Sequence, residues 1–193
     1  AEGDAGPLAD AHAAAWARFS TVLRELVAEL PALRRPVGER HALQGPVAQR
    51  MWQACHPYRA GFITPMAAVA GAVAQEIVAC YARPGIRRAW VNNGGDIALH
   101  LAPGHAVRVG LWSDLARLQP GGGPLRTDGQ FTVDATMPVR GIATSGWRGR
   151  SFSMGIADSV TVLAADAAMA DAAATVIANA VNVDDPRIAR APA

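Results

Sequence analysis

Apolar side chains recur every three or four positions between residues 8 and 33, which predicts a long helix there. Pro31 and Pro36 predict where this helix ends. A second, shorter helix is predicted from Pro46 through Cys55, and a third from Thr64 to Tyr81. The apolar positions of the first helix are Trp16, Phe19, Leu23, Leu26, Val27 and Leu30.

After residue 85 the pattern changes to short alternating runs, which predict strands followed by one more helix. The last helix is predicted from Asp166, a good N-cap residue, to Val181. Strands at this spacing favour antiparallel hairpins, so we predict an α+β fold. We expect a single domain over residues 1–193, with residues 1–37 as an N-terminal helical segment. The strands are predicted at residues 89–91, 97–101, 107–112, 139–143 and 159–165.

The composition of the chain argues against several classes of function. Of the 193 residues 51% are hydrophobic and 18% charged, which is typical of a globular protein, and the net charge is only +2. No basic cluster is interleaved with aromatic residues, which argues against nucleic-acid binding. The longest apolar run, residues 60–74, contains Pro65 and is too short to span a membrane. No signal peptide pattern is seen, so we expect a cytoplasmic protein that does not bind a membrane.

The first segment with candidate chemistry is residues 92–96, Asn-Asn-Gly-Gly-Asp, between two predicted strands. Paired Gly94 and Gly95 permit positive φ and let a ligand approach the backbone closely. Asn93 and Asp96 could hydrogen-bond ligand hydroxyls. The same residues could instead form only a tight hairpin, because Asn-Gly is a strong hairpin signal.

The second segment runs from Gly141 to Gly146 and is followed by Arg148. Its small residues, the hydroxyls of Thr144 and Ser145 and a nearby guanidinium could hold a phosphate or pyrophosphate. An exposed polar turn with a solvated Arg is the alternative.

The third segment is the last predicted helix, where Asp171, Thr175 and Asn179 are four residues apart and share one face. A carboxylate and a hydroxyl one turn apart supply the oxygen ligands that Mg²⁺ prefers. The alternative is a face of this helix that points to solvent.

Four strings in this order resemble the ApbE superfamily, which is named for FAD:protein FMN transferases. They are VNNGGDIAL, GIATSG, DSVTVLA and ADAAATVIANAV, spread over roughly residues 60 to 182. The sequence is still more similar to a short, uncharacterised cytosolic branch of that superfamily. The resemblance implies an ApbE-type, T-fold-like antiparallel sheet with packed helices.

The resemblance also implies roles for individual residues. Asp171 and Thr175 match Mg²⁺ ligands, and Ala143 lies in the segment that lines the same site. Gly94, Gly95 and Asp96 match the flavin pocket, whereas Thr144, Ser145 and Gly146 match the segment near the nucleotide phosphates. In this chain Ala70 stands where the transferases carry Lys, and the stretch before residue 159 contains no His. These departures remove the acid/base candidate and argue against covalent flavinylation of a target protein.

Three functional hypotheses follow. The first is a Mg²⁺-dependent transferase or pyrophosphatase that acts on FAD. The second is a module that binds a flavin or another heteroaromatic ligand without chemistry. The third, implied only by the resemblance, is a factor in biosynthesis of a tetrahydromethanopterin-type C1 carrier. The expected partner is a nucleotide or pterin-like small molecule, and the Ala-rich helices could pack between the subunits of a homodimer.

Overall fold

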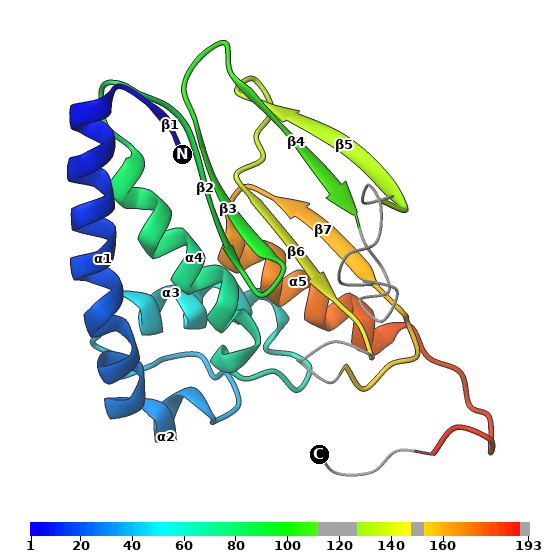
Figure 1. Cartoon of the computed structure of the whole chain (residues 1–193). Coiled ribbons are helices and arrows are strands. Elements are labelled where there is room, and N and C mark those ends of the chain that lie inside the picture. The colour runs from blue at the N-terminus through cyan, green and yellow to red at the C-terminus, as the bar shows by residue number, and fades with distance from the viewer. Residues whose placement is uncertain (112–126, 148–152, 190–193) are drawn as a thin grey trace, which may run out of the picture.

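The computed structural model describes residues 1–111, 127–147 and 153–189 and has the predicted α+β fold (Figure 1). Five strands form an antiparallel sheet in the order β1-β2-β3-β6-β7, and β4 pairs with β5 in a separate hairpin. The strands are β1 (Glu2–Gly3), β2 (Ile86–Asn93), β3 (Asp96–Leu101), β4 (Ala106–Leu111), β5 (Gly129–Asp134), β6 (Gly141–Ser145) and β7 (Val160–Ala164).

The helices gather on one face of the five-stranded sheet, with α4 and α5 next to it and α1 at the edge of the molecule (Figure 1). The long helices are α1 (Ala5–Ala28), α3 (Pro46–Cys55), α4 (Val69–Val78) and α5 (Ala167–Ala180). The short ones are α2 (Leu30–Leu33) and the 3-10 turns η1 (His56–Tyr58), η2 (Pro65–Ala68) and η3 (Ala79–Tyr81).

All four predicted helices are present, with differences at their ends. The first is split at Glu29 into α1 and α2, so Pro31 stands in the first turn of α2 and does not end α1. The third begins and ends as 3-10 turns, and Thr64 precedes it without a side-chain capping bond. Asp166 caps α5 as predicted, because its carboxylate accepts a 2.8 Å hydrogen bond from the amide of Met169.

The predicted strands are confirmed in outline, but β6 begins at Gly141, two residues after its predicted start. Residue 112, the predicted end of the third strand, lies outside the described residues. The sequence analysis missed β5, whose alternating run Gly129–Asp134 is only 6 residues long. It also missed the two-residue strand β1, which pairs with β2.

Two apolar layers cover the two faces of the five-stranded sheet. The larger lies between the sheet and the helices and includes Met51, Ala72 and Ala98. The smaller joins Leu99 and Ile142 of the sheet to the β4–β5 hairpin. On the helix side the sheet and α5 approach so closely that a Cβ on Gly141 would overlap the backbone of Asp166. This close approach brings polar side chains of α5 next to the sheet.

The apolar pattern of α1 predicted a helix correctly, but its largest side chains are not in the core. Trp16, Phe19 and Leu23 are exposed, whereas the face toward the core is formed by small residues and Val22. Within the described part of the chain, no helix combines the length and apolar character that crossing a membrane requires.

Candidate functional site

The β2–β3 turn is the hairpin that the sequence predicted, with Asn93 paired to Asp96 at its tip. Gly94 and Gly95 have φ values of +72° and +117°, a left-handed region that disfavours other residues. The Asn93 amide donates a 3.1 Å hydrogen bond to the carbonyl of Ala70. The turn is therefore anchored to the start of α4.

Asp96 connects this turn to the second predicted segment. Its side chain is buried at 9% exposure, and it accepts a 3.2 Å hydrogen bond from the backbone amide of Thr144 in β6. The Thr144 hydroxyl is exposed and lies 2.9 Å from the Thr161 hydroxyl of β7. Side chains alternate across a strand, so Ala143 and Ser145 lie on the face of β6 opposite to that of Thr144. Both residues are buried there.

Gly146 follows β6 and is also buried, because a Cβ there would overlap the carbonyl of Asp158. Arg148, the guanidinium predicted for the phosphate site, lies outside the described residues. The second segment therefore contributes a buried hydroxyl and backbone groups to the described site.

Asp171 projects from α5 toward the start of α4. Its carboxylate accepts a 2.9 Å hydrogen bond from the amide of Gly71, which satisfies one of the free amides in the first turn of α4. Burial and, after it, the negative charge of Asp96 raise the pKa of Asp171 to about 8, although the amides of Gly71 and Ala70 oppose the shift. Burial also raises the pKa of Asp96 to about 6, against the amide of Thr144.

Thr175 lies one turn further along the same face of α5, and its hydroxyl donates a 3.5 Å hydrogen bond to the carbonyl of Ala67 in η2. Ala143 is fully buried against Ala170 and Ala174 of α5, so it packs beside this face. Asn179 does not join the group. It accepts hydrogen bonds from the Met154 amide and the Ser153 hydroxyl instead.

The predicted segments therefore meet in one place, here called the carboxylate cluster: Asn93, Asp96, Asp171 and Thr175 with the backbone of Ala70 and Gly71. Among the described residues no Arg pairs with either carboxylate. The side-chain donors for a metal are carboxylate and hydroxyl oxygens, the type that Mg²⁺ prefers. No group of three or more His, Cys, Asp or Glu residues gathers as a metal site in the described chain.

Cys55 is a buried neighbour of the cluster, which the sequence analysis named only as the end of a predicted helix. Burial and, after it, the negative charge of Asp171 raise its pKa to about 12. This charge effect places Cys55 of α3 close to Asp171. A thiol with such a pKa stays protonated at neutral pH and is unreactive. No sequence pattern could have linked Cys55 to Asp171, because the two residues lie on different helices.

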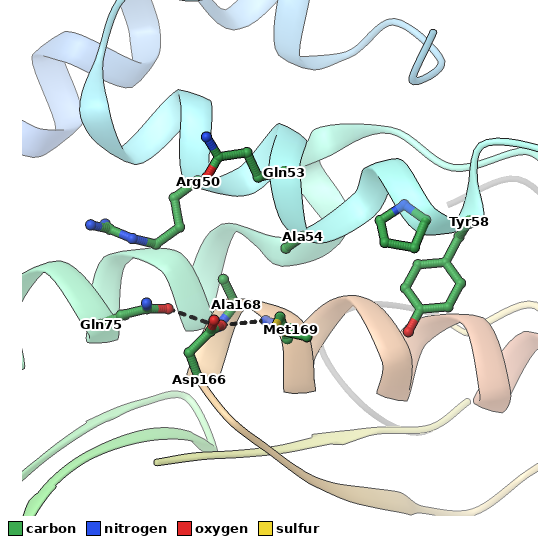
Figure 2. Close-up of a pocket in the computed structure, with 9 residues that line it drawn as sticks. Arg50, Gln53, Ala54, Tyr58, Gln75, Asp166, Ala168 and Met169 are labelled. Atoms are coloured by element: carbon green, nitrogen blue, oxygen red, sulfur yellow. Dashed lines mark hydrogen bonds between the residues drawn. The ribbon is translucent and has the colours of Figure 1, made fainter. Parts of the chain in front are cut away.

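A cavity of about 270 Å³ lies elsewhere, between α3, the end of α4 and the start of α5 (Figure 2). None of its lining residues was predicted as a site residue. Two of its polar side chains have partners: Gln75 accepts from the Ala168 amide at 3.3 Å, and Arg50 donates to Glu76 at 2.8 Å. Its lining residues are Arg50, Gln53, Ala54, Pro57, Tyr58, Gln75, Asp166, Ala168 and Met169.

Three similar sequences each carry the name UPF0280 protein. The relative from Methanospirillum hungatei is 40% identical over 129 residues, 66% of this chain and 49% of the relative. The one from Methanothrix thermoacetophila is 36% identical over 140 residues, 72% of this chain and 54% of the relative. The one from Methanothermobacter thermautotrophicus is 38% identical over 143 residues, 74% of this chain and 51% of the relative.

This chain thus spans about half the length of these relatives. A family profile described as AbpE bacteria matches it along its full length. The chain therefore belongs to the AbpE bacteria family, over residues 1–193.

Proposed function

We propose that this chain binds FAD together with Mg²⁺ at the carboxylate cluster and is a relative of the ApbE superfamily. The observation that carries the proposal is the close pair Asp96 and Asp171. The Asp96 carboxylate is buried and the Asp171 carboxylate half-buried, Asp96 raises the pKa of Asp171, and no Arg of the described residues neutralises them. Such a pair is costly unless it shares a proton or holds a cation.

The residues of the cluster fit Mg²⁺ in kind and number. Mg²⁺ is usually held by one or two carboxylates and completes its shell with water and substrate phosphates. Asp171 and Asp96 would supply the carboxylates and Thr175 a hydroxyl oxygen. The amides of Ala70 and Gly71 would fix the orientation of the Asp171 carboxylate. The bound ion would supply positive charge to neutralise the phosphates of a nucleotide.

The surrounding segments suit a nucleotide with a flat ring. The Gly94-Gly95 turn has no side chains and open space beside it, so a heteroaromatic ring could approach its backbone. Ser145 and Gly146 would offer a hydroxyl and backbone amides to the phosphates, and Arg148 remains a predicted phosphate ligand. In the reaction we expect, water attacks the FMN phosphorus and breaks the pyrophosphate bond of FAD, which releases FMN and AMP. Alternatively an acceptor hydroxyl attacks the same phosphorus, loses its proton, forms the phosphodiester with FMN and releases AMP.

A non-catalytic flavin-binding role is the second candidate, and the contacts of four of the five His residues favour it. His12 contacts Tyr81, His41 and His56 stack against Trp52, and His100 contacts the carbonyl of Ile86. None of these contacts involves the cluster. A general base would therefore have to be one of the carboxylates themselves.

A single assay separates these candidates. The purified chain is mixed with FAD in Mg²⁺ or in EDTA, and bound FAD, FMN and AMP are measured by chromatography. We expect Mg²⁺-dependent FAD binding, which Asp171→Asn abolishes and the exposed control Asp184→Asn retains. AMP release in Mg²⁺ identifies the enzyme, and binding without release identifies the binding module. Failure to bind FAD with any divalent cation would overturn the proposal, and stabilisation by pterins alone would favour a role in C1-carrier biosynthesis.

A further inference from the structure

We propose that Asn179 is a positioning residue for the phosphates of the ligand, an inference that rests on the function proposed above. Asn179 holds the stretch before β7, residues 153–158, against α5, and this stretch in turn holds the end of β6. Asn179 is the third polar residue on the face of α5 that carries Asp171 and Thr175, and it is half-buried. Most neighbouring positions of α5 are alanine, so an amide in this setting needs a hydrogen-bond partner.

The side-chain oxygen of Asn179 holds the beginning of segment 153–158. This oxygen accepts a 2.8 Å hydrogen bond from the backbone amide of Met154 and a 3.2 Å hydrogen bond from the hydroxyl of Ser153. The Ser153 hydroxyl oxygen in turn accepts a 3.3 Å hydrogen bond from the amide of Gly155. One oxygen atom of α5 therefore orders three consecutive residues of the segment.

The middle of the segment follows the C-terminal end of α5. Gly155 passes so close to the helix that a Cβ there would overlap the carbonyl oxygen of Ala178. The amide of Ile156 donates a 2.8 Å hydrogen bond to the carbonyl of Val181, the C-cap residue of α5. These backbone contacts keep the segment on α5 beyond the hydrogen bonds of Asn179.

The last residues of the segment hold the chain just beyond β6. The amide of Trp147 donates a 3.0 Å hydrogen bond to the carbonyl of Ala157, and its indole Nε1 donates one of 3.0 Å to the Asp158 carboxylate. A Cβ on Gly146 would overlap the carbonyl of Asp158. The pairing of β6 with β7 ends at Ser145, so these contacts fix the backbone where the sheet no longer does. A continuous set of contacts therefore leads from Asn179 to Gly146.

This set of contacts ends at the groups that would contact phosphate, the Ser145 hydroxyl and the Gly146 amide. Donors that are held in place before a ligand arrives bind it more tightly, because the ligand does not have to order them. Loss of the Asn179 oxygen should free segment 153–158 and weaken phosphate binding. Mg²⁺ without a ligand should be unaffected, because Asp171 is held by the amide of Gly71 and not by this segment.

Calorimetric titration of FAD and of inorganic pyrophosphate, each in Mg²⁺, tests the proposal. Asn179→Leu removes the oxygen at similar size, whereas Asn179→Asp keeps an acceptor at the same place. We expect at least tenfold weaker binding of both ligands to Asn179→Leu and near-native binding to Asn179→Asp. The titrations are run at about 0.15 M salt, which screens the added charge beyond about 8 Å. Mg²⁺ affinity without a ligand should stay within twofold of native in both variants.

Two further measurements separate positioning from a general loss of stability. Val176→Ala is the matched control, because Val176 lies on the same helix but packs against the larger core, and it should keep native affinity for pyrophosphate. Hydrogen exchange should become at least fivefold faster in segments 153–158 and 144–147 of Asn179→Leu, and should stay native in Asn179→Asp. Unchanged exchange in segment 144–147 would overturn the proposal, because Asn179 would then not act on the end of β6.

The outcomes also separate this proposal from the proposed function. Equal FAD affinity of the native chain and Asn179→Leu would overturn the role of Asn179 and leave the FAD site standing. Pyrophosphate binding that Asn179→Leu weakens, without FAD binding to the native chain, would support the role of Asn179 and reject FAD as the ligand. If the native chain binds neither compound, both proposals are wrong. Weaker binding of Mg²⁺ alone to Asn179→Leu would also overturn the role of Asn179, because the effect would not be confined to phosphate.

Discussion

The carboxylate of Asp171 accepts a hydrogen bond from the amide of Gly71 at 2.9 Å, although 100 positions separate the two residues. The contact depends on glycine at position 71, because a Cβ there would overlap the carbonyl of Ala167 and lie 2.9 Å from the Asp171 Cβ. The missing side chain at Gly71 therefore allows both the close packing of α4 on α5 and the hydrogen bond that orients the Asp171 carboxylate.

Gly71→Ala should lower the free energy of unfolding by about 1–3 kcal/mol, because the added methyl group must push α4 away from α5. Urea denaturation measures this change directly. Gly6→Ala is the matched control, since Gly6 is also helical but a Cβ there meets nothing within 4 Å. It should leave the stability equal or slightly higher. Equal stability of the two variants would mean that the contact is looser than described.

The carboxylate pair predicts how stability depends on pH when no divalent cation is present. Burial and the neighbouring charge raise the pKa of Asp171 to about 8, from a value near 4 in the unfolded chain. The folded state then binds the proton more tightly than the unfolded state, so stability should fall as pH rises from about 4 to about 8.

Thermal denaturation in EDTA between pH 5 and pH 8 measures this fall. Asp171→Asn should remove most of the decline, because the amide carries no charge at either pH. Mg²⁺ should restore part of the stability of the native chain at pH 8. A melting temperature that rises over this interval in EDTA would contradict the raised pKa.

Glu76 of α4 forms ion pairs with α1 and α3, so we expect a substitution of Glu76 to lower the stability of the fold. Its carboxylate is 15% exposed and accepts hydrogen bonds from Arg18 of α1 at 2.7 Å and from Arg50 of α3 at 2.8 Å. Glu76→Gln should cost about 1–3 kcal/mol of unfolding free energy, because both guanidiniums lose a charged partner.

The control for this change is Glu39→Gln, in which an exposed pair with Arg59 is broken. Exposed pairs contribute little, so chemical denaturation should not distinguish this variant from the native chain. If Glu76→Gln also left the free energy of unfolding unchanged, the ion pairs of Glu76 with Arg18 and Arg50 would not stabilise the fold.

The sequence predicted the elements well where patterns are local. Helical spacing, the Asp166 cap and the Asn-Gly turn each depend on neighbouring residues, and all three are confirmed. The predicted start of β6 was wrong, and β5 was not predicted. Short strands depend on partner strands that are distant in the sequence, so a local pattern does not define them well. The exposed face of α1 was also missed, since periodicity shows that a helix has an apolar face but not what covers it.

The carboxylate cluster could be predicted only in part. Asp171 and Thr175 stand out as polar residues on an alanine-rich helix, and Asp96 stands out beside paired glycines. Their closeness to one another depends on the β2–β3–β6 register and on the packing of α5. The proximity of Cys55 and the anchoring of Asn93 to the Ala70 carbonyl follow from the same packing, and no motif indicates them.

Calorimetric titration of Mg²⁺ into the chain in the presence of FAD tests the central claim most directly. The account predicts saturable binding of one Mg²⁺ per chain, at least tenfold weaker in Asp171→Asn and unchanged in Asp184→Asn. Mg²⁺ binding of equal strength in the native chain and in Asp171→Asn would contradict the account, because the ion would then be held elsewhere.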